Sequence, residues 1–296
     1  MLSSHQVKKI HVSIIIVTYN SEKYISKCLF AILDNFSPKY ECEIVIVDNH
    51  SGDKTIQIID KIREKNQSII TTIYKKQNLG FAKAINIALK IKNNSDYYLL
   101  INPDTIVNKY SISNLYQCAV TSKSGVVGGS TYDNNNIQNG SYFRFPNLFV
   151  GMFDFTNLRK LIRSDYWHKY FYYLDSDFSK LAYFTVDVVT GGFMMISKKT
   201  IDKIGYLDER FFMYLEDVDY CLRAKKQGIK VTHCNLSKIF HYGGGSSENK
   251  DRIRHSAWII SRKLFYLKNF NLLSNILIQP IFLLDDIFIL FNKYLK

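Results

Sequence analysis

Short apolar runs alternate with stretches of helical periodicity through the first hundred residues, and this alternation restricts the possible folds. The runs read HVSIIIV, EIVIV and YYLLI, and they begin at residues 11, 43 and 97. Between the first two, Ile25, Cys28, Leu29 and Ile32 recur at the spacing of one helix face. Strands that alternate with helices predict βαβ units and a mostly parallel sheet with helices on both faces. We therefore predict an α/β fold.

Polar side chains follow the predicted strands at their carboxyl ends. In an open α/β sheet, ligands bind in the crevice outside these strand ends. Each residue also has an ordinary structural alternative: Asp48 could cap the next helix, and Asp104 could be a turn residue after Pro103. The residues at the predicted crevice are Thr18, Asn20, Asp48, Asn49, Asn102 and Asp104.

Three carboxylates crowd together in the stretch MYLEDVDYCLRAKKQG, directly after a run of apolar and aromatic residues. A helix that begins near Glu216 would place the acids in its first turn, where they complement the helix dipole. Asp219 and Arg223 stand four residues apart and can pair. Apolar neighbours and adjacent like charges make a carboxylate more basic. Glu216 and Asp217 are therefore either capping residues or members of a site.

Composition limits the partners and the compartment. The formal net charge of +13 favours an anionic partner such as nucleotide phosphates or a membrane surface. Long Lys/Arg runs and nucleic-acid-binding signatures are missing, so no nucleic acid is expected. The five cysteines form no CxxC pair, which favours reduced thiols in a cytoplasmic protein over disulfides or a zinc site. Val12–Val17 is too short for a signal peptide.

Two later regions have a different character. Residues 130–190 are dense in Phe, Tyr and Trp, and they predict a helical excursion packed on the sheet or the wall of a binding site for sugar faces or lipid tails. Residues 251–296 are apolar with Lys and Arg at intervals. Pro280 and the pair Asp285-Asp286 interrupt this tail and argue against a helix that spans a membrane. A core helix and an amphipathic segment at a membrane surface remain as alternatives.

Motifs of other nucleotide-binding folds are missing. A dinucleotide-binding loop would need GxGxxG after the first strand, where the chain reads TYNSEKY. A P-loop would need GxxxxGK followed by Ser or Thr, and HYGGGSSENK does not supply it. The chain is therefore predicted to be neither a Rossmann dehydrogenase nor a P-loop NTPase.

Seven blocks in a fixed order bring a known family into view: VSIIIVTYN, EIVIVDNHSGD, NLGFAKAIN, LLINPDT, TGGFMMI, LDERFFMYLEDVDYCLRAKKQG and HYGGGS. In this order they resemble family 2 glycosyltransferases with the GT-A fold, and they are most similar to the rhamnosyltransferase-like branch. The resemblance runs from Val12 to Ser246. It implies a Rossmann-like GT-A domain over residues 1–250, with residues 130–190 as an acceptor-side insertion. Residues 251–296 lie beyond the resemblance; we expect them to form a C-terminal helical segment, and their basic balance favours the membrane surface over a core helix.

The resemblance implies a donor side and a metal site. Asp48 would accept a hydrogen bond from a pyrimidine base, and Asn78 and Gly80 would shape the loop beside the ribose and diphosphate. Asp104 and His241 would hold Mn²⁺ or Mg²⁺. The family carries an Asp-x-Asp motif where this chain has Asn102 in place of the first acid. The residues implied in nucleotide-sugar and cofactor binding are Thr18, Tyr19, Asn20, Asp48, Asn49, Asn78, Gly80, Asn102 and Asp104.

The resemblance also implies the chemistry. Asp217 corresponds to the catalytic base of an inverting transferase, with Gly191, Gly192 and Glu216 on the acceptor side. Gly243 and the residues after it would form a closing loop. Processive members carry Gln-x-x-Arg-Trp, and the chain has no Arg-Trp pair, which favours addition of a single sugar.

The expected function is therefore transfer of one sugar from dTDP-rhamnose or a UDP-hexose to a glycan or a lipid-linked saccharide in cell-surface polysaccharide synthesis. We expect a cytoplasmic enzyme, peripheral at the inner face of the cell membrane and able to form a homo-oligomer. The alternative is a non-catalytic protein that binds carbohydrate or nucleotide on a transferase-like fold.

Overall fold

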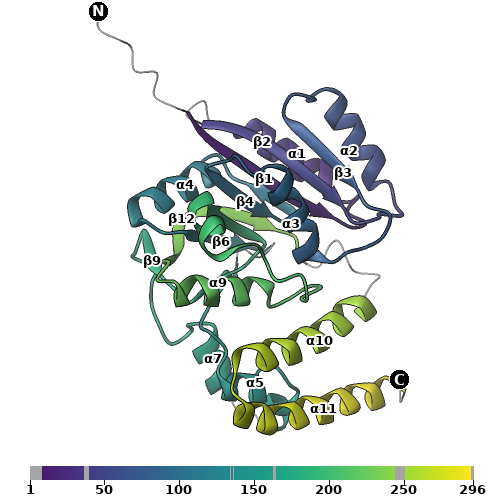
Figure 1. The fold of residues 1–296 in the computed structure, drawn as a ribbon, viewed down its shortest axis with the longest axis vertical. Coiled ribbons are helices and arrows are strands. Elements are labelled where there is room, and N and C mark those ends of the chain that lie inside the picture. The colour runs from purple at the N-terminus through teal and green to yellow at the C-terminus, as the bar shows by residue number, and fades with distance from the viewer. Residues whose placement is uncertain are drawn as a thin grey trace, which may run out of the picture.

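A large mixed sheet organises the chain (Figure 1). The computed structural model describes residues 9–36, 40–133, 135, 137–162, 165–243 and 251–294. The strands run in the order β3-β2-β1-β4-β11-β6-β12-β5, with β7 beside β6 and β9 beside β12, and β8 and β10 form a separate pair. Their bounds are β1 (Ile10–Thr18), β2 (Tyr40–Asp48), β3 (Ile70–Tyr74), β4 (Tyr97–Ile101), β5 (Thr105–Val107), β6 (Val126–Tyr132), β7 (Gln138–Asn139), β8 (Tyr142–Phe143), β9 (Tyr183–Thr185), β10 (Val188–Val189), β11 (Phe193–Ser197) and β12 (Val231–His241).

The predicted α/β fold is confirmed. Strands β3, β2, β1 and β4 are parallel, and β11 joins them as an antiparallel strand. The register aligns Thr18 with Asp48 and Ile16 with Ile101, so the loops after β1, β2 and β4 leave the sheet at one edge. The helices that connect the strands are α1 (Ile25–Asp34), α2 (Thr55–Glu64), α3 (Phe81–Ile91), α4 (Ser111–Ser122), α8 (Lys198–Ile204) and α9 (Glu216–Lys226).

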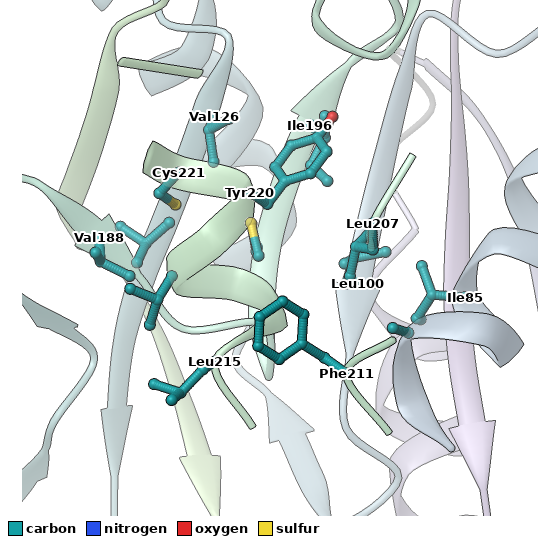
Figure 2. Packing of buried hydrophobic residues seen from close by; sticks show 14 of the residues in the cluster. Ile85, Leu100, Val126, Val188, Ile196, Leu207, Phe211, Leu215, Tyr220 and Cys221 are labelled. Atoms are coloured by element: carbon teal, nitrogen blue, oxygen red, sulfur yellow. The ribbon is translucent and has the colours of Figure 1, made fainter. Parts of the chain in front are cut away.

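Helices cover both faces of the sheet, and the central strands read as continuous apolar runs for that reason. In β1, Ile15 packs in the cluster that contains helices α3 and α9, while Ile14 and Ile16 pack in the cluster of α1, α2 and α4. Figure 2 shows the first cluster, which includes Tyr220 of α9 and Ile196 of β11. These two apolar layers hold the strand ends rigidly in place.

The aromatic region between residues 130 and 190 combines short helices with short strands, and so it is less helical than the pattern predicts. Its helices are α5 (Leu148–Phe153), α6 (Leu158–Ile162) and α7 (Tyr166–Phe171). Strands β8 and β10 pair within it, and β9 extends the main sheet. Phe155 makes edge-to-face contacts with Phe171 and with Trp258 of the C-terminal region. Ring packing of this kind has no sequence period.

The C-terminal region is a pair of helices, α10 (Asp251–Asn269) and α11 (Leu272–Tyr294), that lie side by side at the end of the molecule away from β1–β3 (Figure 1). The expectation that Pro280 interrupts the tail is wrong, because α11 continues through it. The helix loses one internal hydrogen bond there but keeps its packing against α10. Within the described residues, the stretch Leu272–Ile289 is long and apolar enough to cross a bilayer, and 22% of it is buried.

Candidate active site

A cavity of about 300 Å³ opens at the carboxyl ends of the strands. Seven residues predicted for the site line it: Tyr19, Asn49, Asn78, Gly80, Asn102, Asp104 and His241. Phe81, Phe212, Tyr214 and Arg254 line it as well, and sequence reasoning did not single them out. Phe212 and Tyr214 belong to the aromatic run before the acidic pair, which was a usable signal. Arg254 comes from α10, where no local pattern marked it.

Asp104 and His241 meet in this cavity. His241 is the last residue of β12 and pairs in register with Thr105 of β5, so its ring comes beside the preceding Asp104. His241 Nε2 lies 3.0 Å from Asp104 Oδ1. Asp104 is 4% exposed, and its backbone oxygen accepts a hydrogen bond from the amide of Tyr242. The sheet therefore fixes both side chains before any ligand binds.

The Asp104–His241 pair fits a divalent cation. Neighbouring ligands of an octahedral ion with bonds of about 2.1 Å stand about 3.0 Å apart, close to the separation seen here. One carboxylate oxygen and one imidazole nitrogen suit Mn²⁺ somewhat better than Mg²⁺. No cluster of three or more His, Cys, Asp or Glu ligands occurs among the described residues. The remaining positions around an ion would fall to substrate and water, as is usual for Mg²⁺ in phosphate sites.

Thr18 and Asp48 lie at the same edge of the sheet but do not line the cavity. Both are fully buried, and Thr18 Oγ1 donates to Asp48 Oδ1 at 2.7 Å. The same carboxylate accepts hydrogen bonds from the amide and the hydroxyl of Ser51. Asn20, in the left-handed region with φ 51°, accepts a hydrogen bond from the amide of Gly52. These residues tie the loops after β1 and β2 together beside the cavity.

The loop before α3 forms another wall. Asn49 Nδ2 donates to the carbonyl of Gly80, and Asn78 Oδ1 accepts from the amide of Gly80. Gly80 has φ 83°, and a Cβ there would lie 2.4 Å from the carbonyl oxygen of Phe212. That carbonyl accepts a hydrogen bond of 2.6 Å from the amide of Phe81. A glycine is therefore required where this loop meets the segment that leads to the acidic pair.

Asp217 stands at the start of α9 and faces the glycine pair. Its Oδ2 accepts from the amide of Gly191 at 2.9 Å, and its Oδ1 accepts from the amide of Val218 at 2.8 Å. The side chain is half-buried, and burial raises the pKa of this carboxyl above its ordinary value. The two hydrogen bonds oppose that rise but do not cancel it. Asp217 is therefore held in one orientation and is more basic than a surface carboxylate.

Glu216 is the more deeply buried member of the acidic pair. It is 5% exposed, and its Oε2 has no hydrogen-bond partner among the described residues. Burial, and then the neighbouring Asp217, raise the pKa of Glu216 well above its usual range. This environment favours the protonated form of Glu216 more than water does. Two adjacent acids thus have different environments.

Asp219 has a structural role. It is fully buried and pairs with Arg223 Nε at 3.0 Å, as the spacing predicted. Lys268 of α10 adds a second contact at 2.6 Å. Arg223 also donates to the backbone oxygens of Ile204 and Tyr206. This network anchors α9 and, with it, the position of Asp217.

Two hydrogen bonds of the glycine pair link Asp217 to the loop that contains Asp104. Gly191 binds Asp217, and the carbonyl of Gly192 accepts a 3.0 Å hydrogen bond from the amide of Asn102, which is two residues before Asp104. A Cβ on Gly192 would lie 2.8 Å from Asn102 Nδ2. The glycine pair therefore allows the two halves of the site to approach at one edge of the sheet.

A second cavity of about 260 Å³ lies beside the first, and Tyr214 lines both. Its lining includes Glu216, Asp217 and Thr190, and its aromatic wall consists of Phe143, Phe155, Phe171, Tyr172 and Trp258. Tyr214 and Leu215 both lie in the left-handed region, with φ 73° and 66°. Such backbone strain in non-glycine residues persists only where the surroundings impose it.

Helix α10 anchors Met213 and Tyr214, and Tyr214 lines both cavities. Arg254 Nε donates to the Tyr214 hydroxyl at 3.0 Å, and Ser261 Oγ donates to the carbonyl of Met213 at 2.8 Å. The C-terminal region thus contributes directly to both cavities. The predicted closing loop after Gly243 falls on residues 244–250, outside the described residues.

Comparison with known families gives a consistent result. Residues 13–205, about two thirds of the chain, match the model of Glycosyl transferase family 2. A relative from Haloferax volcanii, the low-salt glycan biosynthesis hexosyltransferase Agl10, is 26% identical over 77% of this chain. The chain spans 66% of that relative's length, and between 17% and 47% of the length of seven further curated relatives.

Solved structures show the same fold at low sequence identity. Staphylococcus aureus TarS in complex with UDP-GlcNAc matches with a TM-score of 0.56 at 18% identity, covering 88% of this chain and 67% of that one. The mannosyltransferase PcManGT from Pyrobaculum calidifontis, in complex with GDP-Man and Mn²⁺, matches with a TM-score of 0.58 at 14% identity, covering 90% of this chain and 66% of that one. The predicted GT-A fold is confirmed by these likenesses.

Proposed function

The chain belongs to glycosyl transferase family 2 and has the GT-A fold, and we propose from this premise that it is an inverting, metal-dependent glycosyltransferase that adds a single sugar. The observation that carries the proposal is the position of Asp217. It binds the amide of Gly191, and the next residue, Gly192, binds Asn102 in the cavity that contains Asp104 and His241. A leaving-group side and a base side then lie in adjacent cavities that share Tyr214 as a lining residue, and a direct displacement needs such neighbouring positions.

The first cavity is the proposed donor site. Asn49, Asn78 and Gly80 offer amide and backbone groups, and Tyr19 offers an aromatic wall, which together suit a nucleotide. Asp48 and Thr18 support this wall from behind through the loop that contains Asn20, and contact between Asp48 and a base would replace a bond to Ser51. The complexes of TarS with UDP-GlcNAc and of PcManGT with GDP-Man support a nucleotide sugar as the donor.

Asp104 and His241 are the proposed ligands of Mn²⁺ or Mg²⁺, with the Asn102 amide beside them. When bound, the ion would offset the negative charge that builds on a diphosphate leaving group. Asn102 replaces an acid, so the protein supplies one charge fewer. Arg254 lines the same cavity and is the proposed second source of positive charge for the phosphates.

Asp217 is the proposed general base. An acceptor hydroxyl would lose its proton to this carboxylate while its oxygen bonds to the anomeric carbon and the bond from that carbon to the diphosphate breaks. The raised pKa makes the ionised form of Asp217 a stronger base than an ordinary carboxylate. The amides of Gly191 and Val218 keep it aimed, so little reorientation is needed during the reaction.

The acceptor site is proposed in the second cavity, next to Gly191, Gly192 and Glu216. Its aromatic wall suits the faces of sugar rings. We propose a glycan or lipid-linked saccharide as the acceptor, dTDP-rhamnose or a UDP-hexose as the donor, and cell-surface polysaccharide synthesis as the setting.

The proposed domain division assigns residues 1–250 to the transferase domain, with 130–190 as its acceptor-side insertion, and residues 251–296 to the C-terminal segment. The proposal includes a cytoplasmic site of action at the inner membrane face and self-association into a homo-oligomer.

A panel of nucleotide sugars tests the function. Thermal stabilisation and slow hydrolysis of each donor are measured with and without Mn²⁺. The proposal predicts one preferred donor whose binding and hydrolysis both depend on the metal. Binding without hydrolysis for every donor would support a non-catalytic binding protein, and absence of binding would contradict the assigned site.

A further inference from the structure

Helix α11 buries acidic side chains while it exposes leucines. Its inward face combines two fully buried apolar side chains, Ile278 and Phe282, with Asn275, Asp285 and Asp286, which are all less than a tenth exposed. Its outward face carries an apolar stripe that we define as Leu273, Ile276, Leu277, Leu283, Leu284 and Ile287, each more than half exposed. These residues recur at separations of three, four and seven, which is the spacing of one helix face. A helix on the surface of a soluble protein normally carries polar side chains on its outward face instead.

An ion-pair network locks this orientation. Arg262 of α10 is 1% exposed and donates to Asp285 Oδ2 at 2.7 Å and to Asp286 Oδ1. Asp285 also accepts two hydrogen bonds from Asn157, and Asn275 Nδ2 donates to the carbonyl of Tyr266 at 3.0 Å. Rotation of α11 to bury its leucines would leave Arg262 without its counter-ions, which is strongly unfavourable for a buried charge. The apolar stripe is therefore a fixed outer surface.

We propose that the apolar stripe of α11 docks on the surface of an anionic lipid bilayer, with the helix lying in the interface. Residues 251–296 contain seven Lys and Arg against three Asp, and two of those Asp are the buried partners of Arg262. Arg262, Lys263 and Lys268 pair with carboxylates inside the protein, so the attraction to anionic headgroups rests on the net charge of +13 of the whole chain, while the leucines enter the acyl boundary.

Charge and packing disfavour the other occupants of the stripe. In a two-fold dimer the same basic segment would face itself and repel. A crossing orientation would place α11 across the hydrocarbon, but its inner face is tied through Asp285 and Asp286 to α10 and through Asp285 to Asn157. An interfacial helix with one side on the protein and the other in lipid satisfies both faces.

The docked orientation also affects how an acceptor would reach the site. This part of the inference rests on the proposed function. Helix α10 packs on α11 and contributes Trp258 to the second cavity and Arg254 to the first. Docking of α11 would therefore hold the aromatic cavity close to the bilayer. An acceptor saccharide carried on a membrane lipid would reach Asp217 from the headgroup layer, and this favours a lipid-linked acceptor over a free glycan.

Sedimentation with vesicles tests the surface. The variant Leu277→Glu/Leu284→Glu is compared with Phe30→Glu/Ile91→Glu, which places the same two charges at similarly exposed apolar sites on α1 and α3. Vesicles of phosphatidylglycerol with phosphatidylcholine are the probe, and pure phosphatidylcholine is the charge control. The unchanged protein and the α1/α3 variant are expected to bind the anionic vesicles, and the α11 variant to lose at least about 100-fold in affinity.

Two results would overturn the inference. One is equal vesicle binding by both variants. The other is a dimer that the α11 variant converts to a monomer in light scattering while no protein binds vesicles, because the stripe would then be a self-association surface. Melting curves check that the variants fold, and metal-dependent donor binding is measured in each. Donor binding that fails in the unchanged protein, with vesicle binding as predicted, would reject the proposed function and leave the docking surface standing.

Discussion

The imidazole Nε2 of His241 lies 3.0 Å from Oδ1 of Asp104, although the two residues are 137 positions apart in the chain. The antiparallel pairing of β12 with β5 brings them together, so the contact belongs to the sheet rather than to a flexible loop. The pair occupies the same cavity as Asn102 and Arg254. A preformed pair at a sheet edge is the arrangement on which metal-dependent donor binding would depend.

Replacement of either metal ligand is expected to weaken donor binding in the presence of Mn²⁺. Asp104→Ala and His241→Ala should each lower the affinity for the nucleotide sugar by about tenfold or more, since each removes one of the two protein ligands of the metal. Titration calorimetry with and without Mn²⁺ measures the effect. Asp202→Ala, which removes an exposed carboxylate on α8, is the control and should leave binding unchanged. Metal-dependent affinity that persists in both site variants would reject these residues as ligands.

Addition of a single methyl group at Gly192 is expected to disturb the site. In Gly192→Ala, the new Cβ would press on Asn102 Nδ2, and relief of such a clash costs about 1–3 kcal/mol of stability. We expect a lower melting temperature and reduced donor binding because Asn102 lines the cavity. Gly52→Ala is the matched control, because its Cβ would meet nothing within 4 Å. Identical behaviour of the two variants would show that the close approach at Gly192 has no functional role.

The raised pKa of Glu216 predicts a pH-dependent stability difference. The folded protein holds this proton more tightly than the unfolded chain, so stability falls as pH rises from the ordinary glutamate value of 4.5 through the raised folded value. Glu216→Gln cannot titrate there. The variant should therefore gain unfolding free energy relative to the unchanged protein as pH rises through this interval. Denaturant titrations at several pH values measure the difference, and a difference that does not vary with pH would contradict the shift.

Loss of the buried arginine is expected to destabilise the C-terminal region. Arg262→Ala leaves Asp285 buried without a counter-ion and Asp286 with Lys263 alone, which costs about 3–5 kcal/mol. Lys198→Ala removes one partner of an exposed pair and should cost about 1 kcal/mol or less. Chemical denaturation compares the two. Equal, small effects would show that the Arg262 network does not fix α11.

Several site residues were predictable because strand ends have a simple geometry. Asn49, Asn102 and Asp104 follow buried parallel strands, and such strands end at a common edge, so their convergence on one cavity follows from the pattern. The same pattern selects Asp48, but it does not say which way a side chain faces. Asp48 turns towards Thr18 and Ser51 and leaves the cavity wall to its neighbour Asn49.

Other features depend on packing between distant elements. Arg254 and Trp258 reach the cavities only because α10 lies against the segment from Met213 to Leu215, and no local period in the sequence encodes that contact. Pro280 was expected to interrupt the tail, but tertiary contacts of α11 outweigh the loss of one hydrogen bond. The inward orientation of Asp285 and Asp286 likewise requires knowledge of Arg262, which makes these buried acids tolerable.

The most direct test of the account compares Asp217→Asn with the unchanged protein in two measurements made side by side. Donor affinity in the presence of Mn²⁺ should be the same, because Asp217 does not line the donor cavity. Transfer of the donor sugar, to water or to an acceptor, should fall by about 10²–10⁴-fold, since Asp217 is the proposed acceptor of the proton. Transfer by Asp217→Asn at the unchanged rate would contradict the assignment of the base.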